Sequence, residues 1–363
     1  MSFRVVVKIG TSSLTDDRGI IDDTAVVKLS AEVAQLRAAG TDVIVVSSGA
    51  VAAGVAALQL DKRPTDVGTL HAIAAAGQAR LMRSWDDALA PHGLVPAQAL
   101  LVPQDFIDRR QYLHARRTLT RLLQLGAVPI INENDAIASD EIRYGDNDRL
   151  AALVAHNMAA SLLVLLTDLD GLYTADPRRH PDAELITTVR VDDPLLAIQA
   201  GRGGSGRGSG GMASKLESAR IASWSGVPTV IANATRPGVL AGAVDGAAVG
   251  THFDARKRRL SARKLWIAFA ARVAGSVTVD DGARRALTER PTSLLPAGVV
   301  SVEGRFDNGD TVEVRGTDGE AFARGMVFVE SNQLRKAAGM HTRDLPEGMV
   351  HEVIHRDDLV LLP

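Results

Sequence analysis

The first two-thirds of the chain alternate short apolar runs, rich in β-branched residues, with segments whose apolar positions recur every three or four residues. The helical pattern is clearest between the first two runs, where Val26, Leu29, Val33 and Leu36 fall on one face of a predicted helix. Apolar strands alternating with helices are typical of an α/β fold, with a mainly parallel sheet sandwiched by helices. The runs predicted as strands are residues 4–9, 43–46, 128–131, 162–166 and 227–231.

The pattern changes towards the end of the chain. Six of the nine residues 256–264 are basic, which indicates a solvated linker. Beyond it, single valines alternate with polar residues on both sides of 307–310 (Asp-Asn-Gly-Asp), the signal of a tight hairpin in a small, mostly β domain. These valines are Val300, Val302, Val312 and Val314.

A chain of 363 residues exceeds one average domain, so two unequal domains are expected. We predict a catalytic domain at 1–255, a linker at 256–273 and a small β domain at 274–363.

Composition narrows the function classes. The chain is 46% hydrophobic and 23% charged, as expected of a globular protein with real cores. It has no cysteine, which excludes disulfides, thiolate catalysis and cysteine zinc sites. No apolar run approaches the roughly 18 residues of a membrane helix, and the start lacks a signal-peptide layout. We therefore expect a cytoplasmic enzyme or binding protein without membrane partners.

Charge is unevenly distributed along the chain. Residues 274–363 hold 10 Lys and Arg against 15 Asp and Glu, whereas the rest of the chain has a small basic excess. Nucleic-acid-binding modules usually present a basic face. The acidic tail therefore argues against a function in binding RNA.

In sheets of this kind, ligands bind beyond the carboxyl ends of the strands, so the residues after each apolar run are the candidates. Lys8 lies inside the first run and is followed by Gly10 and three hydroxyl residues. A buried ammonium needs a partner, and here a phosphate that also accepts backbone N–H groups would serve. The alternative is a lysine at the sheet rim whose charged end reaches water.

The second strand ends in Ser47, Ser48, Gly49 and Ala50, small residues that let a ligand approach the following helix N-terminus. Taken alone, the pattern favours a plain strand-to-helix turn with a serine cap.

Polar clusters follow the third strand at 132–135 (Asn-Glu-Asn-Asp) and 145–148 (Gly-Asp-Asn-Asp). One residue of the second cluster is expected to cap the next helix, but capping does not account for both clusters. Their carboxylates and amides suit the ammonium and carboxylate of an amino acid.

Two further segments follow the later strands. The turn at 167–177 is ordinary loop sequence with polar atoms suited to a nucleotide. Seven of the eleven residues 201–211 are glycine, so their G-x-G-x-x-G matches carry little information. Lys215 lies at the start of the next helix. A glycine-rich loop that places a lysine there is better explained by binding of nucleotide phosphates than by a disordered linker.

Taken in order, these segments resemble the glutamate 5-kinases of the amino acid kinase family over nearly the whole chain. Aspartate kinases and UMP kinases tend to differ at the first strand, reading K-F-G-G-T and K-L-S-G. The tail resembles a PUA domain, and Ser209 stands where the family often has threonine. The matching segments are KIGTSSLT at 8–15, SSGAVAAG at 47–54, NENDAIA at 132–138, GDND at 145–148, TDLDGLYTADPR at 167–178 and GSGGMASK at 208–215.

The resemblance implies an amino acid kinase fold and phosphorylation of the L-glutamate γ-carboxylate by ATP, the first step of proline synthesis. By motif position, Lys8 and Lys215 would bind the transferred phosphoryl group. The residues that would hold glutamate are Ser48, Asp135 and Asn147, with Asp146 nearby. The nucleotide contacts would be Thr167, Asp168, Ser209, Gly210, Gly211, Met212, Ala213, Ser214 and Lys215.

The implied chemistry is reasonable at neutral pH. A glutamate side chain has a pKa near 4.3, so the nucleophile is already ionised and needs no general base. Positioning and positive charge are what phosphoryl transfer requires, and two lysines with Mg²⁺ supply that charge. We expect Asp148 to orient the lysines and Mg²⁺ to be held largely by the phosphates, so no protein ligand is named.

Two alternatives stay open at this point. One is a related kinase acting on another carboxylate, such as that of aspartate. The other is an RNA-associated protein that acts through the PUA-like tail. The family resemblance also leads us to expect proline as a feedback inhibitor and a homo-oligomeric assembly.

Overall fold

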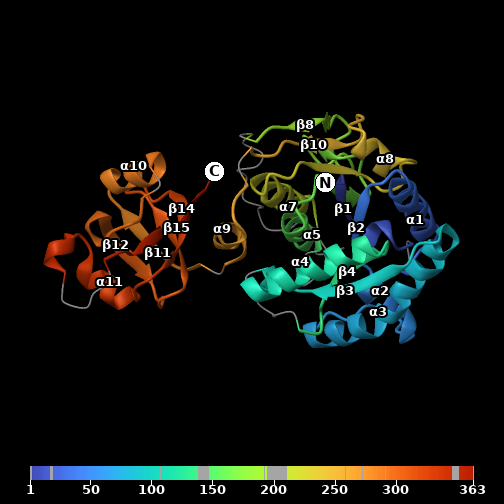
Figure 1. Cartoon of the computed structure of the whole chain (residues 1–363), viewed down its shortest axis with the longest axis horizontal. Helices are drawn as coiled ribbons and strands as arrows, with labels where there is room; N and C mark the ends of the chain where they lie inside the picture. Colours follow the sequence, from blue (N-terminus) through green and yellow to red (C-terminus); the bar gives the residue numbers. More distant parts are fainter. Residues whose placement is uncertain are drawn as a thin grey trace. The chain divides into compact units, whose positions relative to one another are not determined.

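The chain divides into two compact units, residues 1–259 and 260–363 (Figure 1). The division falls inside the segment 256–273 that the sequence predicts as a linker. The computed structural model describes residues 2–16, 19–106, 108–137, 147–191, 193, 211–257, 259–271, 273–290, 292–345 and 351–362.

Unit 1 is built on an eight-stranded sheet with the order β3-β4-β2-β1-β5-β9-β10-β8. Neighbours from β3 to β9 are parallel, whereas β10 runs antiparallel to β9. The strands are β1 (Arg4–Ile9), β2 (Asp42–Ser47), β3 (Pro96–Leu101), β4 (Val128–Glu133), β5 (Leu162–Thr167), β8 (Thr188–Val189), β9 (Thr229–Asn233) and β10 (Thr251–Phe253). A two-stranded sheet adds β6 (Leu172–Tyr173) and β7 (Leu185–Ile186).

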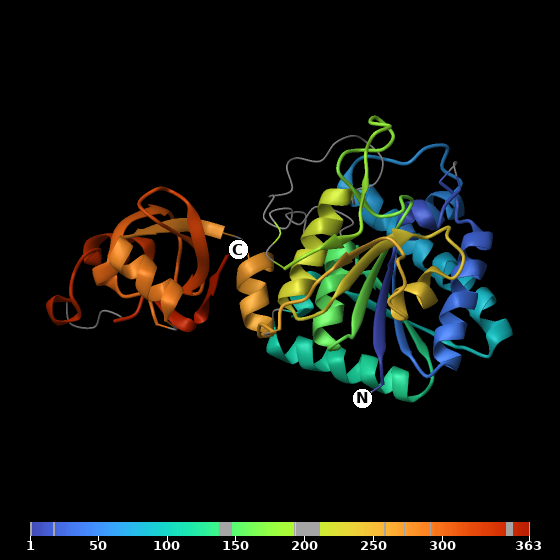
Figure 2. The same cartoon turned by 90° about the horizontal axis from the view of Figure 1, so that it is seen from above.

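Helices cover both faces of this sheet (Figures 1 and 2). One face carries α1 and α3, with α8 beside α1, and the other carries α5 and α7. The helices are α1 (Asp23–Ala38), α2 (Ala50–Ala57), α3 (Val67–Leu89), α4 (Arg109–Gln124), α5 (Asn147–Asn157), α7 (Met212–Trp224) and α8 (Val239–Val244). Short 3₁₀ turns are η1 (Thr11–Ser13), η2 (Ala90–His92) and η3 (Pro103–Phe106). The predicted α/β fold class is confirmed.

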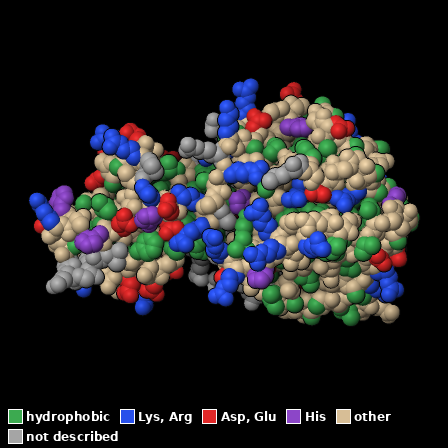
Figure 3. Space-filling model, viewed as in Figure 1, with side chains coloured by type: hydrophobic (Ala, Val, Ile, Leu, Met, Phe, Trp, Pro, Cys, Tyr) green, Lys and Arg blue, Asp and Glu red, His purple; other side chains and the backbone are tan. Residues whose placement is uncertain are grey.

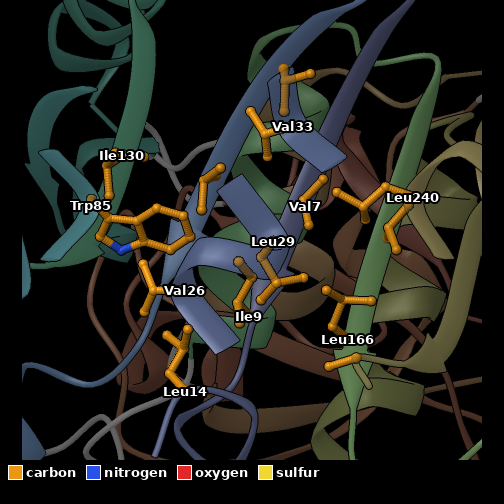
Figure 4. Close-up of a cluster of buried hydrophobic side chains, with 14 of the residues drawn as sticks. Val7, Ile9, Leu14, Val26, Leu29, Val33, Trp85, Ile130, Leu166 and Leu240 are labelled. Carbon is orange, nitrogen blue, oxygen red and sulfur yellow. The ribbon is translucent and has the colours of Figure 1, made fainter. Parts of the chain in front are cut away.

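The alternation of side chains along β1 decides which layer each residue enters. Val5, Val7 and Ile9 join the buried cluster that α1, α3 and α8 form with the sheet (Figure 4). Lys8 is out of phase with these residues, so it lies on the face of α5 and α7. The strand pattern thereby separates the apolar core from the charged site described below.

Close helix packing accounts for Gly54, which lies in α2 shortly after the predicted anion-binding turn at 47–50. A Cβ on Gly54 in α2 would lie 1.9 Å from the carbonyl oxygen of Ile73 in α3. A Cβ on Gly77 in α3 would lie 1.9 Å from the carbonyl oxygen of Ala50. The two glycines therefore let the backbones of α2 and α3 approach each other.

The basic excess of unit 1 is concentrated on α4, which contains five arginines and no acidic residue. The carbonyl of Tyr112 in α4 accepts a hydrogen bond from Asn157 at the end of α5 (3.0 Å). Figure 2 shows α4 near the end of the sheet where β1 begins, and Figure 3 shows Lys and Arg side chains where Figure 1 draws α4. These exposed arginines thus lie away from the carboxyl ends of the strands. They are Arg109, Arg110, Arg116, Arg117 and Arg121.

Unit 2 is a five-stranded sheet with the order β12-β11-β13-β14-β15. Its strands are β11 (Val273–Val279), β12 (Val299–Gly304), β13 (Thr311–Arg315), β14 (Ala321–Val327) and β15 (Ile354–Leu361). Its helices are α9 (Ala262–Leu265), the π-helical turn η4 (Trp266–Ala270), α10 (Asp281–Glu289) and α11 (Ser331–Ala337), with 3₁₀ turns η5 (Pro296–Gly298) and η6 (Thr342–Asp344). The linker segment is therefore partly helical, and Leu265 and Ile267 are buried.

The predicted hairpin between β12 and β13 is wrong. A turn does form, because the amide of Asp310 donates to the carbonyl of Asp307 (3.1 Å). However, β11 lies between the two strands, antiparallel to β12 and parallel to β13. Long-range pairing with β11 therefore overrides the local hairpin signal.

In the described part of the chain, no helix is both long and apolar enough to cross a membrane.

We predict that Gly77→Ala destabilises unit 1 by about 1–3 kcal/mol, because its methyl group would overlap the backbone of α2. The matched control is Gly68→Ala in the same helix, where a Cβ would meet nothing within 4 Å. That change should be neutral or stabilising, since alanine favours helix more than glycine does. Denaturant unfolding followed by circular dichroism compares the two variants, and equal stability would contradict the packing argument.

Candidate functional site

The carboxyl ends of the parallel strands meet at one edge of the unit 1 sheet. Ile9 pairs with Ser47 on β2 and with Leu166 on β5, while Thr167 pairs with Asn233 on β9. The polar residues after these strands are therefore neighbours, although they are far apart in the sequence.

A buried carboxylate joins two lysines at this edge. Asp148 Oδ1 lies 2.7 Å from Lys8 Nζ, and Asp148 Oδ2 lies 3.1 Å from Lys215 Nζ. The three side chains are almost fully buried. One carboxylate thus contacts two ammonium groups from distant parts of the chain.

The environment keeps Asp148 ionised. Burial alone would raise the pKa of this carboxyl, but the charges and hydrogen bonds of Lys8 and Lys215 outweigh it and lower the pKa. Asp148 also lies in the first turn of α5, where the helix dipole favours negative charge. Removing one partner of a buried ion pair usually costs about 3–5 kcal/mol, so the three residues act as a unit.

The N-terminus of α7 completes this cluster. Gly211 is the N-cap residue, and Ser214 Oγ donates to Asp148 Oδ2 (3.0 Å). The first N–H groups of a helix have no partner within the helix, so the start of α7, with Met212 and Ala213, provides donors for an anion. The position of Lys215 in this turn brings its ammonium group to the same place.

An amide and hydroxyl network lies directly beside the charged cluster, because Asn147 precedes Asp148. Asn147 Nδ2 donates to Ser48 Oγ (3.1 Å) and to Asn132 Oδ1 (3.0 Å). Asn132 Oδ1 also accepts from the amide of Glu133 (2.9 Å). The ends of β2 and β4 and the start of α5 are thereby tied together.

Asp135 follows β4 and is mostly buried. Burial raises its pKa to about 6, and the nearby His71 on α3 only partly offsets the effect. A carboxylate that is costly to ionise gains from a cationic ligand. A cation beside Asp135 would favour its ionised form and so offset the effect of burial on its pKa.

Thr167 and Asp168 lie at the end of β5. Thr167 Oγ1 donates to Asp168 Oδ1 (3.1 Å), and Arg178 forms an ion pair with Asp168. Burial alone would raise the pKa of Asp168, but a hydrogen bond from its own backbone amide, together with the Thr167 and Arg178 contacts, outweighs it and lowers the pKa. On the neighbouring strand, Asn233 Nδ2 donates to Asp170 Oδ1 (3.0 Å).

Three predicted site residues, Asp146, Ser209 and Gly210, lie outside the described residues. The structure brings together Lys8, Asp148, Ser214 and Lys215, and joins Asn147 to Ser48 in the adjacent network. The other predicted residues that the structure describes lie at the same edge of the sheet.

Sequence reasoning missed Asn132 and Asn233 as individual site residues. Both lie at the carboxyl ends of strands, so the rule that pointed to Lys8 and Thr167 applies equally to them. Asn132 is the more informative of the two, because its Nδ2 is buried and has no hydrogen-bond acceptor within the described part of the chain. An acceptor supplied by a ligand would satisfy this donor.

Among the described residues, no preformed metal site is present. The described residues include no group of three or more His, Asp or Glu side chains suited to a metal ion. Both oxygens of Asp148 are engaged by lysines.

Comparison with known proteins identifies the class. The model of the amino acid kinase family matches residues 3–233, and the model of the PUA domain matches residues 275–349. Two solved structures share the fold of much of the chain. Isopentenyl phosphate kinase of T. acidophilum, in a product complex, has a TM-score of 0.50 and 21% identity, covering 69% of this chain and 99% of that one. UMP kinase from Ureaplasma parvum has a TM-score of 0.50 and 16% identity, covering 70% and 99%.

Curated relatives are similar over almost their whole length. Proteins named glutamate 5-kinase from Mycolicibacterium smegmatis and Pelobacter propionicus are 48% and 43% identical to this chain, respectively. The first match covers 98% of this chain and 96% of the relative, and the second covers 99% and 97%. The chain belongs to the amino acid kinase family. Within that family it belongs with the glutamate 5-kinases that carry a C-terminal PUA domain.

Proposed function

We propose that the protein transfers the γ-phosphate of ATP to the γ-carboxylate of L-glutamate, the first step of proline synthesis. The observation that carries this proposal is the pair of buried lysines held by Asp148 beside the Asn147 network. The relatives named glutamate 5-kinase give the reaction and substrate.

The lysine cluster suits phosphoryl transfer to a carboxylate. The acceptor is ionised at neutral pH, so repulsion from the ATP phosphates is the main obstacle rather than proton removal. Lys8 and Lys215 place two positive charges together, and Asp148 fixes their ammonium groups before the substrates bind. Preorganised charge of this kind stabilises a transition state without reorganisation at the moment of reaction.

The neighbouring residues divide between the two substrates. Asp135 faces the glutamate ammonium, and Ser48, Asn147 and Asn132 provide hydrogen bonds to its main-chain end. Thr167, Asp168 and the start of α7 contact the nucleotide. A Mg²⁺ ion brought in with the nucleotide would supply further positive charge near the transferred group.

Proline is proposed as an inhibitor that occupies the glutamate site. It carries the same α-carboxylate and a cationic nitrogen in the same place, so Asp135 and Asn147 suit either molecule. It lacks the side-chain carboxylate and therefore cannot react. The homo-oligomeric assembly and the cytoplasmic location stay predictions.

The function is tested with purified protein, Mg-ATP and glutamate. We expect ADP release, and hydroxylamine should trap an acyl phosphate as a hydroxamate. Aspartate and N-acetylglutamate are the competing acceptors in the same assay. Equal or faster turnover with aspartate would contradict the substrate assignment and favour the related-kinase alternative.

Lys8→Ala and Lys215→Ala should each lower kcat by roughly 10²-fold or more, because each removes charge needed as the phosphoryl group moves. The control is Lys264→Ala, whose ammonium group donates to the carbonyl of Arg356 in unit 2 (3.1 Å). That variant should turn over at the wild-type rate. A folded Lys8→Ala or Lys215→Ala enzyme with wild-type kcat would remove that lysine from the mechanism.

The pKa of Asp135, about 6, predicts a pH-dependent affinity for glutamate. Above this pH the carboxylate is ionised and attracts the ammonium group; below it the carboxyl is neutral and the attraction is lost. The KM for glutamate should therefore rise roughly tenfold between pH 7 and pH 5, while the KM for ATP changes less. Asp135→Asn should raise the KM at pH 7 and flatten this profile.

The matched control is Asp108→Asn, which alters an exposed helix cap whose carboxylate accepts from the amides of Arg110 and Gln111. It should retain the wild-type pH profile. Initial rates over a grid of glutamate and proline concentrations extend the test, since Asp135→Asn should weaken both ligands. Proline inhibition that glutamate does not relieve would indicate a separate site.

A further inference from the structure

A buried hydrogen-bond relay connects helix α3 to the end of β2. Its first two members, Trp85 and Ser47, belong neither to the predicted site residues nor to the lysine cluster. Trp85 in α3 is fully buried and belongs to the apolar cluster in which Figure 4 labels Val26 and Ile130. Its Nε1 donates to Ser47 Oγ (3.1 Å). An indole N–H buried in an apolar core needs an acceptor, and Ser47 is that acceptor.

The direction of this relay is fixed by chemistry. An indole N–H only donates, so Ser47 Oγ must accept from Trp85. The serine hydroxyl then retains its own proton, which it donates to the carbonyl of Ser48 (3.0 Å). Trp85 thus acts on the backbone of Ser48 through one intervening hydroxyl group.

The backbone at Ser48 is held from both sides. Its amide donates to the carbonyl of Ile9 in β1 (3.0 Å), while its carbonyl accepts from Ser47. Gly49, the next residue, has φ of 106°, a left-handed conformation that glycine adopts without strain, and α2 begins directly after it. The relay therefore fixes the peptide group at which the chain turns from β2 into α2.

Ser48 is the residue that this geometry presents to the site. Its Oγ accepts from Asn147 Nδ2 (3.1 Å), which also donates to Asn132. A change in the Ser48 backbone would move an oxygen at the centre of this network. Because the charged cluster lies on Lys8, Asp148 and Lys215, such a change would affect the amino-acid end more than the phosphoryl end.

We propose that Trp85 and Ser47 are positioning residues for the amino-acid substrate, an inference that rests on the proposed binding of glutamate at Ser48. The indole N–H orients the Ser47 hydroxyl, and that hydroxyl holds the Ser48 carbonyl so that Ser48 Oγ meets Asn147. The ring of Trp85 packs in the apolar core, whereas its N–H group helps to position the residues of the site.

Two substitutions remove the relay at different points. Trp85→Phe removes the N–H and keeps a large aromatic ring, and Ser47→Ala removes the intervening hydroxyl. Each should raise the KM for glutamate by about 3- to 10-fold, the scale of one lost neutral hydrogen bond. The kcat at saturating glutamate and the KM for ATP should stay at wild-type values.

The double variant separates a relay from two independent defects. If Trp85 acts through Ser47, Trp85→Phe combined with Ser47→Ala should raise the KM for glutamate no more than the larger single change does. Independent effects would multiply instead. A multiplied KM in the double variant would overturn the relay.

The control variants are Trp224→Phe and Ser225→Ala, which change a buried tryptophan and a buried serine at the far end of α7. The Ser225 hydroxyl donates to the carbonyl of Ile221 (2.8 Å). Their unfolding midpoints should fall while the KM for glutamate stays unchanged. If Trp85→Phe and Ser47→Ala behave in the same way, the relay serves stability only and the proposal is overturned.

A measurement on the wild-type protein covers the case in which the relay variants do not fold. The chain has three tryptophans, so its indole N–H resonances form a small set. Addition of glutamate should shift the Trp85 indole resonance and leave that of Trp224 in place. No shift at saturating glutamate would overturn the proposal. Wild-type turnover with glutamate, measured first, distinguishes a failed relay from a failed function.

Discussion

The site depends on one buried carboxylate. Asp148 holds Lys8 from the first strand and Lys215 from α7, residues separated by most of unit 1 in the sequence. Without it, two ammonium groups would repel each other in a buried environment where charge is costly. With it, two positive charges are held in place before any substrate binds, as phosphoryl transfer to an anionic acceptor requires.

The parallel sheet explains why the neighbouring residues meet there. Adjacent parallel strands bring Ile9, Ser47 and Thr167 to one edge, and the alternation along β1 places Lys8 on the face of α5. The opposite face is occupied by an apolar core that contains Trp85. Through the hydrogen bonds of Ser47, this core is connected to the backbone of Ser48, the residue proposed to bind the amino acid.

Prediction from sequence succeeded where the signal was local. The five apolar runs form strands of the sheet, because buried parallel strands are apolar along their whole length. It failed for β3, β8 and β10, which are short or poor in β-branched residues, and for the hairpin at 307–310, where β11 inserts between β12 and β13. Pairing between distant segments leaves no mark in a local pattern.

The sequence by itself determined the fold class, the edge of the sheet at which ligands are expected and the residue types available there. Motif position also assigned Lys8 and Lys215 to one reaction, and Asp148 was expected to orient them, although the contacts among the three were not readable. Only the tertiary structure decided that Asp148 bridges both lysines, that Asn132 joins Asn147 and that Trp85 reaches Ser48 through Ser47. The physical reason is that hydrogen bonds and ion pairs act over about 3 Å, so the distance between folded atoms governs them whatever their separation along the chain.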